Sequence, residues 1–275
     1  MILPLALVQM TSTTSIEENL TLAEPLIREA AKQGAKLISL PEVSNLVQIK
    51  RTESTKEACF QEEDRFLSGC QSLAKELGVW IHIGSCVIKL PDDNRMANRA
   101  FMIDDQGEIK ATYDKIHMFD VDLEGGESYR ESTSFKPGEH AVTVETPWGT
   151  IGLTICYDVR FPHLHRSLAH AGAKVILNPA AFTQKTGEAH WHILLAARAI
   201  ETTCFVAAAA QTGHHDDGRD TYGHSLVIDP WGKMLADAGT TIGIIRVDLD
   251  LEDVTKARAM VPSLQNGRDF SLPNN

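Results

Sequence analysis

The chain has 275 residues, 43% of them hydrophobic, which suffices for the core of one large layered domain or of two small ones. Its 26 lysine and arginine residues against 37 acidic residues give a formal net charge of −11. That balance opposes binding to nucleic acid and to anionic membranes, so neither is an expected partner. An anionic small molecule would need a local basic group.

The first ten residues are apolar, but they lack the positively charged leader and the small-residue cleavage site of a signal peptide. We expect them to form the first strand. No apolar run approaches the roughly 18–20 residues that a membrane span requires. The five cysteines are odd in number and show no close-spaced pair, which argues against a disulfide framework and a thiolate zinc site. These features predict a soluble, cytoplasmic protein with reduced thiols.

Helices and strands alternate in the first third of the chain. Ser15 and Glu18 form a capping box at the start of an apolar-periodic segment that Gly34 can terminate, which predicts a helix over 15–34. The same alternation predicts three further elements, namely a strand over 36–42, a helix over 66–78 and a strand over 79–88.

From residue 98 the pattern changes to hairpins, because a glycine-containing turn separates two extended segments in each of three stretches. No linker rich in Pro, Gly or Ser divides the chain. We therefore expect a single α/β domain over residues 1–262, with a C-terminal tail over 263–275. The expected hairpins span 98–114, 140–156 and 224–237, the helices 162–172, 187–202 and 250–260, and one more buried strand 173–182.

Three residues far apart in the chain each follow an apolar run where a strand gives way to a turn: Glu42, Lys115 and Cys156. A sheet could hold all three side chains at one edge, and a thiol, a carboxylate and an ammonium are a sufficient set for covalent acyl transfer. Cys156 would attack from a sharp turn between strand and helix, and Glu42 would be a general base whose pKa is raised by burial. Lys115 and the backbone N–H of Tyr157 would stabilise the oxyanion.

Each of the three residues also has a structural interpretation when taken alone. Cys156 has the size and polarity of a core residue, which is the role we expect for the other four cysteines. Glu42 could be a surface turn residue, and Lys115 could form a solvated ion pair with a neighbouring aspartate. The sequence around the three residues favours the catalytic interpretation.

The segments that carry them resemble three motifs of the nitrilase superfamily, also called the carbon-nitrogen hydrolases, in the order in which that family has them. The motifs are Pro41-Glu42, residues 113–117 (YDKIH) and residues 155–162 (ICYDVRFP). The resemblance implies a four-layer α-β-β-α sandwich with two mixed sheets, which a homodimer extends to eight layers. It also implies that Glu42 is the general base, Lys115 the oxyanion stabiliser and Cys156 the nucleophile. A second glutamate of the family matches Glu131, which would orient Lys115 and the substrate amide.

Residues 187–213 and 222–239 are similar to the Nit-type amidases, and among these they most resemble the deaminated glutathione amidases. Tyr157-Asp158 stands where true nitrilases usually have Trp-Glu, which favours the amidase branch. The resemblance also implies three substrate contacts, with Arg160 binding the carboxylate or 2-oxo acid end of the substrate bidentately. Alternatively, Arg160 pairs with Asp158 or caps a helix, and Phe182 belongs to the core. The three contacts are Arg160, Phe182 and Thr186.

The expected reaction is hydrolysis of the amide of a 2-oxo acid, with deaminated glutathione giving 2-oxoglutarate and cysteinylglycine. The alternatives are an omega-amidase acting on 2-oxoglutaramate, an N-carbamoyl amide hydrolase and, from another class, a catalytically silent binding protein. Neither a cofactor nor a metal is expected, although histidines recur at 163–165, 190–192 and 214–215.

Two further segments have expected roles. Residues 214–220 should form a solvated loop, with the additional hypothesis that this loop reaches the distal part of a peptide-like substrate. Arg198 and Glu201 should form a structural ion pair on a helix.

Overall fold

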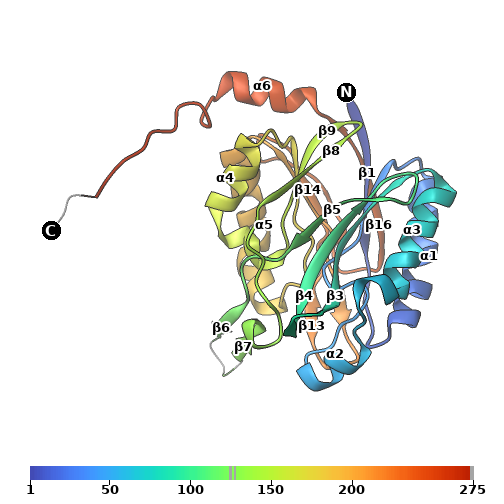
Figure 1. Cartoon of the computed structure of the whole chain (residues 1–275). Helices are drawn as coiled ribbons and strands as arrows, with labels where there is room; N and C mark the ends of the chain where they lie inside the picture. The colour runs from blue at the N-terminus through green and yellow to red at the C-terminus, as the bar shows by residue number, and fades with distance from the viewer. Residues whose placement is uncertain (124–125, 127, 273–275) are drawn as a thin grey trace.

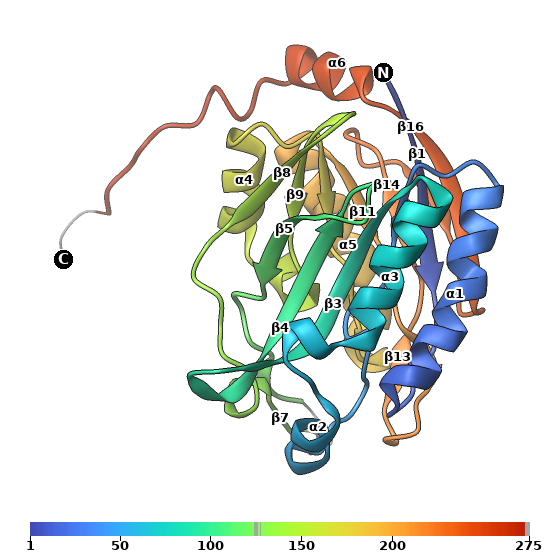
Figure 2. The ribbon, with the colours of Figure 1, turned by 45° about the vertical axis from the view of Figure 1, so that its right-hand side comes forward.

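The computed structural model describes residues 1–123, 126 and 128–272, in which two six-stranded sheets pack face to face between two layers of helices (Figure 1). Helices α1 (Ile16–Lys32) and α3 (Arg65–Leu77) cover one sheet, lying side by side in Figure 2. Helices α4 (Pro162–His170) and α5 (Gln184–Thr202) cover the other. The predicted four-layer α-β-β-α sandwich with two mixed sheets is confirmed.

The first sheet combines parallel and antiparallel strands in the order β16-β1-β2-β3-β4-β5. β1, β2 and β3 are parallel, whereas β16, β4 and β5 pair antiparallel with their neighbours. The Ser15 side chain accepts the Glu18 N–H at 3.4 Å and so caps α1, while Gly78 ends α3 in the left-handed conformation. The strands are β1 (Ile2–Gln9), β2 (Leu37–Ser39), β3 (Trp80–Leu90), β4 (Asp93–Ile103), β5 (Ile109–Asp114) and β16 (Gly243–Asp250).

The second sheet has the order β15-β14-β11-β10-β9-β8. Its three central strands β9, β10 and β11 are parallel, and the predicted hairpins form antiparallel pairs at both edges. The strands are β8 (Val142–Thr146), β9 (Gly149–Leu153), β10 (Val175–Leu177), β11 (Phe205–Ala208), β14 (Leu226–Ile228) and β15 (Met234–Asp237).

Alternate side chains of β1 enter two different cores. Leu5 and Leu7 are buried between the sheets together with Leu177 of the second sheet. Ala6 and Val8 point the other way, into the core beneath α1 and α3. Because successive strand residues point to opposite faces, one apolar strand can serve both layers, which explains its continuous hydrophobic sequence.

Gly84 of β3 lets the two sheets meet closely next to the strand ends. A Cβ atom there would lie 2.5 Å from the carbonyl oxygen of Pro41 and 2.4 Å from the Cβ of Pro179. The Pro179 carbonyl in turn accepts the Cys156 N–H at 2.8 Å. A side chain at position 84 would therefore displace the turns that carry Glu42 and Cys156.

Some local structure differs from the expectations. Helix α2 (Arg51–Glu57) was not predicted, because its sequence RTESTKE has no apolar periodicity. The solvated loop expected at 214–220 is wrong in part: these residues connect β12 (Thr212–His214) to β13 (Asp220–Tyr222), and His215 within them is buried. Cys59 is half-buried rather than a core residue, whereas the other cysteines assigned to packing are buried, namely Cys70, Cys86 and Cys204.

The C-terminal segment leaves the sandwich after α6 (Glu252–Met260), and the chain beyond it runs away from the sheets in Figure 1. Residues 273–275 of the predicted tail lie outside the described part of the structure. The expected ion pair between Arg198 and Glu201 is present on α5. None of the helices in the described residues combines the length and apolarity needed to cross a bilayer.

Candidate active site

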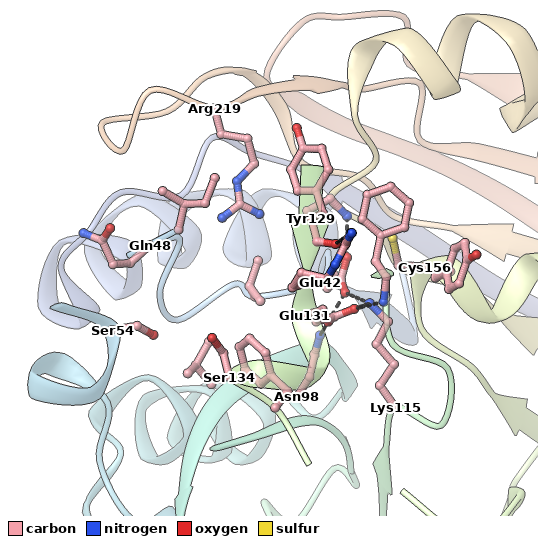
Figure 3. A pocket seen from close by; sticks show the side chains of 18 of the residues that line it. Glu42, Gln48, Ser54, Asn98, Lys115, Tyr129, Glu131, Ser134, Cys156 and Arg219 are labelled. Carbon is pink, nitrogen blue, oxygen red and sulfur yellow. Dashed lines mark hydrogen bonds and ion pairs between the residues drawn. The ribbon is translucent and has the colours of Figure 1, made fainter. Parts of the chain in front are cut away.

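The structure brings four of the predicted catalytic residues together at one end of the sheets (Figure 3). Glu42 follows β2 and Lys115 directly follows β5, while Glu131 and Cys156 each begin a short 3₁₀ helix. Glu131 comes directly after the small hairpin of β6 (Asp120–Asp122) and β7 (Ser128–Arg130).

Lys115 lies between two carboxylates. Its Nζ is 2.9 Å from Glu42 Oε1 and 2.9 Å from both carboxylate oxygens of Glu131. Only 2% of the Lys115 side chain is exposed. Burial lowers the pKa of Lys115, but the charges of Glu131 and Glu42 outweigh burial and raise this pKa well above 10.5. The ammonium is therefore charged at neutral pH.

Glu42 is ionised, and its pKa moves opposite to the direction expected from the sequence. Burial has the largest single effect and raises the pKa of Glu42, but the Lys115 charge and the hydrogen bonds to the carboxylate together outweigh it, so the net pKa lies below the usual 4.5. Hydrogen bonds also stabilise the charged form, because Oε2 accepts the Ala181 N–H at 2.8 Å and Oε1 accepts Asn98 Nδ2 at 2.9 Å. A buried carboxylate beside a buried ammonium remains a proton acceptor at neutral pH.

Cys156 is held in a strained backbone conformation with φ of 49°, in the left-handed region that side chains other than glycine rarely adopt. Asn178 Nδ2 donates to its carbonyl at 3.3 Å. Burial and the Glu42 charge raise the pKa of the thiol well above 9.0, although Lys115 opposes them. Cys156 is therefore a neutral thiol in the resting state, and a base must remove its proton during attack.

Asp158 links the Cys156 turn to the segment that carries Lys115. Its buried carboxylate accepts the Tyr113 hydroxyl at 2.6 Å and the Ile155 N–H at 2.8 Å. It also accepts the His117 N–H at 3.1 Å and lies 2.7 Å from His117 Nδ1. Because these partners flank both Lys115 and Cys156, Asp158 fixes the two functional segments relative to each other. The sequence did not predict this contact.

Asn98 is a site residue that sequence reasoning missed. Its Nδ2 lies 2.9 Å from Glu42 Oε1 and 3.2 Å from Glu131 Oε1, so it separates the two carboxylates. Its backbone carbonyl accepts the Lys115 N–H at 3.0 Å. Asn98 stands inside β4, where an isolated polar residue gave no signal of a role in the site.

A cavity of about 370 Å³ opens above the four residues, within the usual size range of small-molecule sites. Tyr157, Phe182 and Thr186 line it together with the cluster. Phe182 is also largely buried and packs against Trp191, with ring centroids 4.8 Å apart, so it belongs to the core and also lines the cavity. The cavity is further lined by three arginines, namely Arg51, Arg130 and Arg219. Arg219 belongs to the segment 214–220, which was expected to reach the distal part of a substrate.

Arg160 lies beside this cavity and does not line it. Its guanidinium carbon is 5.7 Å from the ring centroid of Phe182 and 5.8 Å from that of Tyr157, and Nη2 lies 3.2 Å from His190 Nδ1. The alternative partner Asp158 is bonded instead to the Tyr113 and His117 groups described above.

One histidine of the segment 190–192 lies near a second histidine and an aspartate in the described residues. His192, His224 and Asp237 place one ligand atom each within 4.8 Å of one another. None of these three residues lines the cavity above Cys156. The cluster is therefore separate from the candidate active site.

Comparison with known proteins identifies the family. Residues 4–259 match the model of the carbon-nitrogen hydrolases. The chain belongs to the carbon-nitrogen hydrolase family. It is 39% identical to the deaminated glutathione amidase of Yersinia enterocolitica over 97% of this chain and 93% of that one. It is 41% identical to the enzyme of the same name from Synechocystis sp., over 95% and 96% of the two chains.

Solved structures agree with this assignment. The crystal structure of the NitFhit protein of C. elegans superimposes with a TM-score of 0.91 at 36% identity, covering 97% of this chain. The chain spans 65% of that longer NitFhit protein. Together, the family match and the amidase relatives show that the protein is a hydrolase acting on carbon–nitrogen bonds of amides.

Proposed function

We propose that this carbon-nitrogen hydrolase cleaves the amide of a 2-oxo acid, with deaminated glutathione as substrate and 2-oxoglutarate and cysteinylglycine as products. The observation that carries the proposal is the buried cluster of Cys156, Glu42, Lys115 and Glu131 at the base of an arginine-lined cavity. The names of relatives about 40% identical over nearly the whole chain support the choice of substrate.

The cluster favours a two-step covalent mechanism. Glu42 accepts the proton of Cys156 while the sulfur attacks the amide carbon, which forms the C–S bond and a tetrahedral oxyanion. The C–N bond then breaks, the proton passes from Glu42 to the leaving amine, and a thioester remains. Glu42 next deprotonates a water molecule that attacks the thioester, which releases the acid and returns the proton to the sulfur.

Lys115 and the Tyr157 N–H are the donors proposed for the oxyanion. Tyr157 is in the first turn of a 3₁₀ helix, where backbone N–H groups have no partner within the helix. An ammonium has three N–H donors, and Lys115 directs its contacts to Glu42 and to both oxygens of Glu131. One contact to Glu131 must therefore give way when the oxyanion forms, so Glu131 orients Lys115 in the resting enzyme.

Arg160, Phe182 and Thr186 are the residues proposed to bind the 2-oxo acid half. Phe182 and Thr186 line the cavity, and the Arg160 guanidinium lies over the outer side of Phe182. A rotation of the Arg160 side chain away from His190 would bring its paired N–H donors to a carboxylate at the cavity edge.

A substrate profile tests this proposal. The kcat/KM for deaminated glutathione should exceed that for 2-oxoglutaramate by at least about tenfold, because only the former offers contacts on both sides of the amide bond. Release of 2-oxoglutarate gives the rate for both compounds. A preference for 2-oxoglutaramate would identify the enzyme as an omega-amidase. Release of carbon dioxide from N-carbamoyl amides would identify it as an N-carbamoyl amide hydrolase. Inactivity on all three kinds of substrate would contradict the proposal.

We also infer that two copies of the chain associate through α5 and the neighbouring hairpin. Ile193 and Ile200 of α5 are 71% and 54% exposed, and Trp231 at the hairpin tip is 59% exposed. Gly232 next to Trp231 lies directly against Ile200, which places the hairpin tip beside α5 and its exposed apolar side chains. Light scattering should give a molar mass of about 60 kDa, twice the 30.2 kDa of the chain. A monomer at micromolar concentration would contradict this inference.

A cytoplasmic location is part of the same proposal. All five cysteines are free, which suits a reducing compartment.

A further inference from the structure

Arg219 stands on a rigid support within the turn that connects β12 to β13. The turn is closed by a hydrogen bond from the His215 N–H to the Arg219 carbonyl at 2.8 Å. The buried His215 ring anchors it, with Nδ1 2.8 Å from the Ser12 carbonyl and Nε2 2.8 Å from Thr221 Oγ1. A side chain on this turn is therefore held in place relative to the sheets.

Asp217 fixes the guanidinium of Arg219. The Asp217 side chain is 0% exposed, and its Oδ2 accepts the Ile49 N–H at 2.8 Å and Arg219 Nη2 at 3.1 Å. Arg219 Nε is buried, and it has no hydrogen-bond partner in the described residues. Since a guanidinium carries five N–H donors in a fixed plane, Arg219 is preorganised and retains donors for an anion.

Arg219 lies in the same cavity as Cys156. Figure 3 places its guanidinium within the pocket, across from Cys156 in that view. A second cavity of about 530 Å³ shares Arg219, Ile49, Tyr129 and Thr183 with the first, so Arg219 stands where the two spaces adjoin. A ligand that fills the first cavity therefore contacts both Cys156 and Arg219.

We propose that Arg219, held by Asp217, binds the terminal carboxylate of the departing amine and thereby selects peptide-like amides over simple ones. This inference rests on the proposed function. In a cysteinylglycine leaving group the carboxylate lies two residues from the scissile nitrogen, about 7 Å when extended. The ammonia released from 2-oxoglutaramate has no such group, so Arg219 distinguishes two substrates that share their acyl half.

The other two arginines of the cavity are less suited to this role. Arg130 is paired with both oxygens of Asp122, at 2.8 and 2.9 Å, and also donates to the Tyr129 carbonyl at 2.7 Å. Arg51 is exposed, and its Nη2 donates to the Asn94 carbonyl at 3.3 Å. A solvated arginine binds a carboxylate weakly, because water competes for its donors.

The test compares Arg219→Gln with the wild type on deaminated glutathione, on its glycinamide-terminated analogue and on 2-oxoglutaramate. Arg219→Gln should lower kcat/KM for deaminated glutathione about 10- to 100-fold and leave that for 2-oxoglutaramate within about twofold. The kcat/KM of the wild type should be lower for the glycinamide analogue than for deaminated glutathione by a similar factor. For Arg219→Gln the two compounds should give nearly the same kcat/KM, because losing the carboxylate and losing the guanidinium remove the same contact.

Arg246→Gln provides the matched control. Arg246 pairs with Asp248 two residues away, as Arg219 does with Asp217, but it lies on β16 away from both cavities. This variant should keep the wild-type preference.

Several outcomes would overturn the inference. Equal losses by Arg219→Gln on all substrates would indicate a structural role of the turn, and no loss would exclude the contact. A selective loss in Arg51→Gln but not in Arg219→Gln would assign the carboxylate to Arg51. In each case the wild type would still cleave 2-oxo amides, whereas a wild type inactive on all three compounds would instead refute the proposed function together with this inference.

Discussion

Replacing Cys156 by alanine should abolish amide hydrolysis, with a loss of at least about 10⁴-fold in kcat, and should leave the fold intact. The change removes one sulfur atom that is the only proposed acyl acceptor, and the remaining groups can only activate water. The thiol is buried, small and next to the ionised Glu42, so its loss should move Tm by a few degrees at most. Turnover at saturating substrate and thermal unfolding measure the two effects.

Cys59→Ala is the control for this experiment, because Cys59 is half-buried and does not line the cavity. It should retain wild-type kcat. Residual activity of Cys156→Ala above about 1% of wild type would be incompatible with a cysteine nucleophile.

Replacing Lys115 by methionine should cost both activity and stability. Without the ammonium, Glu42 is an uncompensated buried carboxylate that faces the partly exposed Glu131, and breaking the buried Lys115–Glu42 ion pair costs about 3–5 kcal/mol. The oxyanion also loses its charged donor, which should lower kcat about 10²- to 10³-fold or more. Urea unfolding and steady-state kinetics measure these effects. Lys32→Met, which removes an exposed lysine near Glu29, should change neither by a measurable amount.

The pH dependence of the same variants gives an independent check. In the wild type the pKa of Glu42 is below 4.5, so its contribution to stability is present above 4.5 and is lost as pH falls through the folded-state pKa. The pKa of Lys115 is above 10.5, so its contribution is present below 10.5 and is lost as pH rises further. Glu42 and Lys115 should therefore contribute little to any change in the wild-type free energy of unfolding between pH 5 and 7.

In Lys115→Met the sign reverses, because burial without a cation raises the pKa of Glu42. The variant should become more stable as pH falls from 7 to 5. A variant that loses stability over that range would show that the carboxylates are not held charged by Lys115.

The sequence predicted the elements whose pattern is local. The capping box at Ser15, the apolar stripes of α1 and α3, and the turn glycines of the hairpins each act within a few residues. Glu42, Lys115 and Cys156 were found because each follows a strand. The expectation of a single sheet was wrong, because Glu42 and Lys115 follow strands of the first sheet and Cys156 follows β9 of the second.

Contacts between distant segments were not predictable in the same way. The bond from the Ile49 N–H to Asp217 joins residues 168 positions apart, and no local pattern signals it. The predicted direction of the Glu42 pKa shift was also wrong. An apolar neighbourhood in the sequence indicates that Glu42 is buried, but it does not indicate that Lys115 Nζ lies 2.9 Å from the carboxylate. Asn98 was missed because a single amide side chain inside a strand belongs to no sequence motif that would indicate a role in the site.

The covalent role of Cys156 is tested most directly by the intact mass of the enzyme quenched during turnover of deaminated glutathione, with Glu42→Gln used to slow both proton transfers. The mechanism predicts a mass increase of one 2-oxoacyl group, located by peptide mapping on Cys156 and absent from Cys156→Ala. An acyl group on another residue, or turnover that persists in Cys156→Ala, would contradict it.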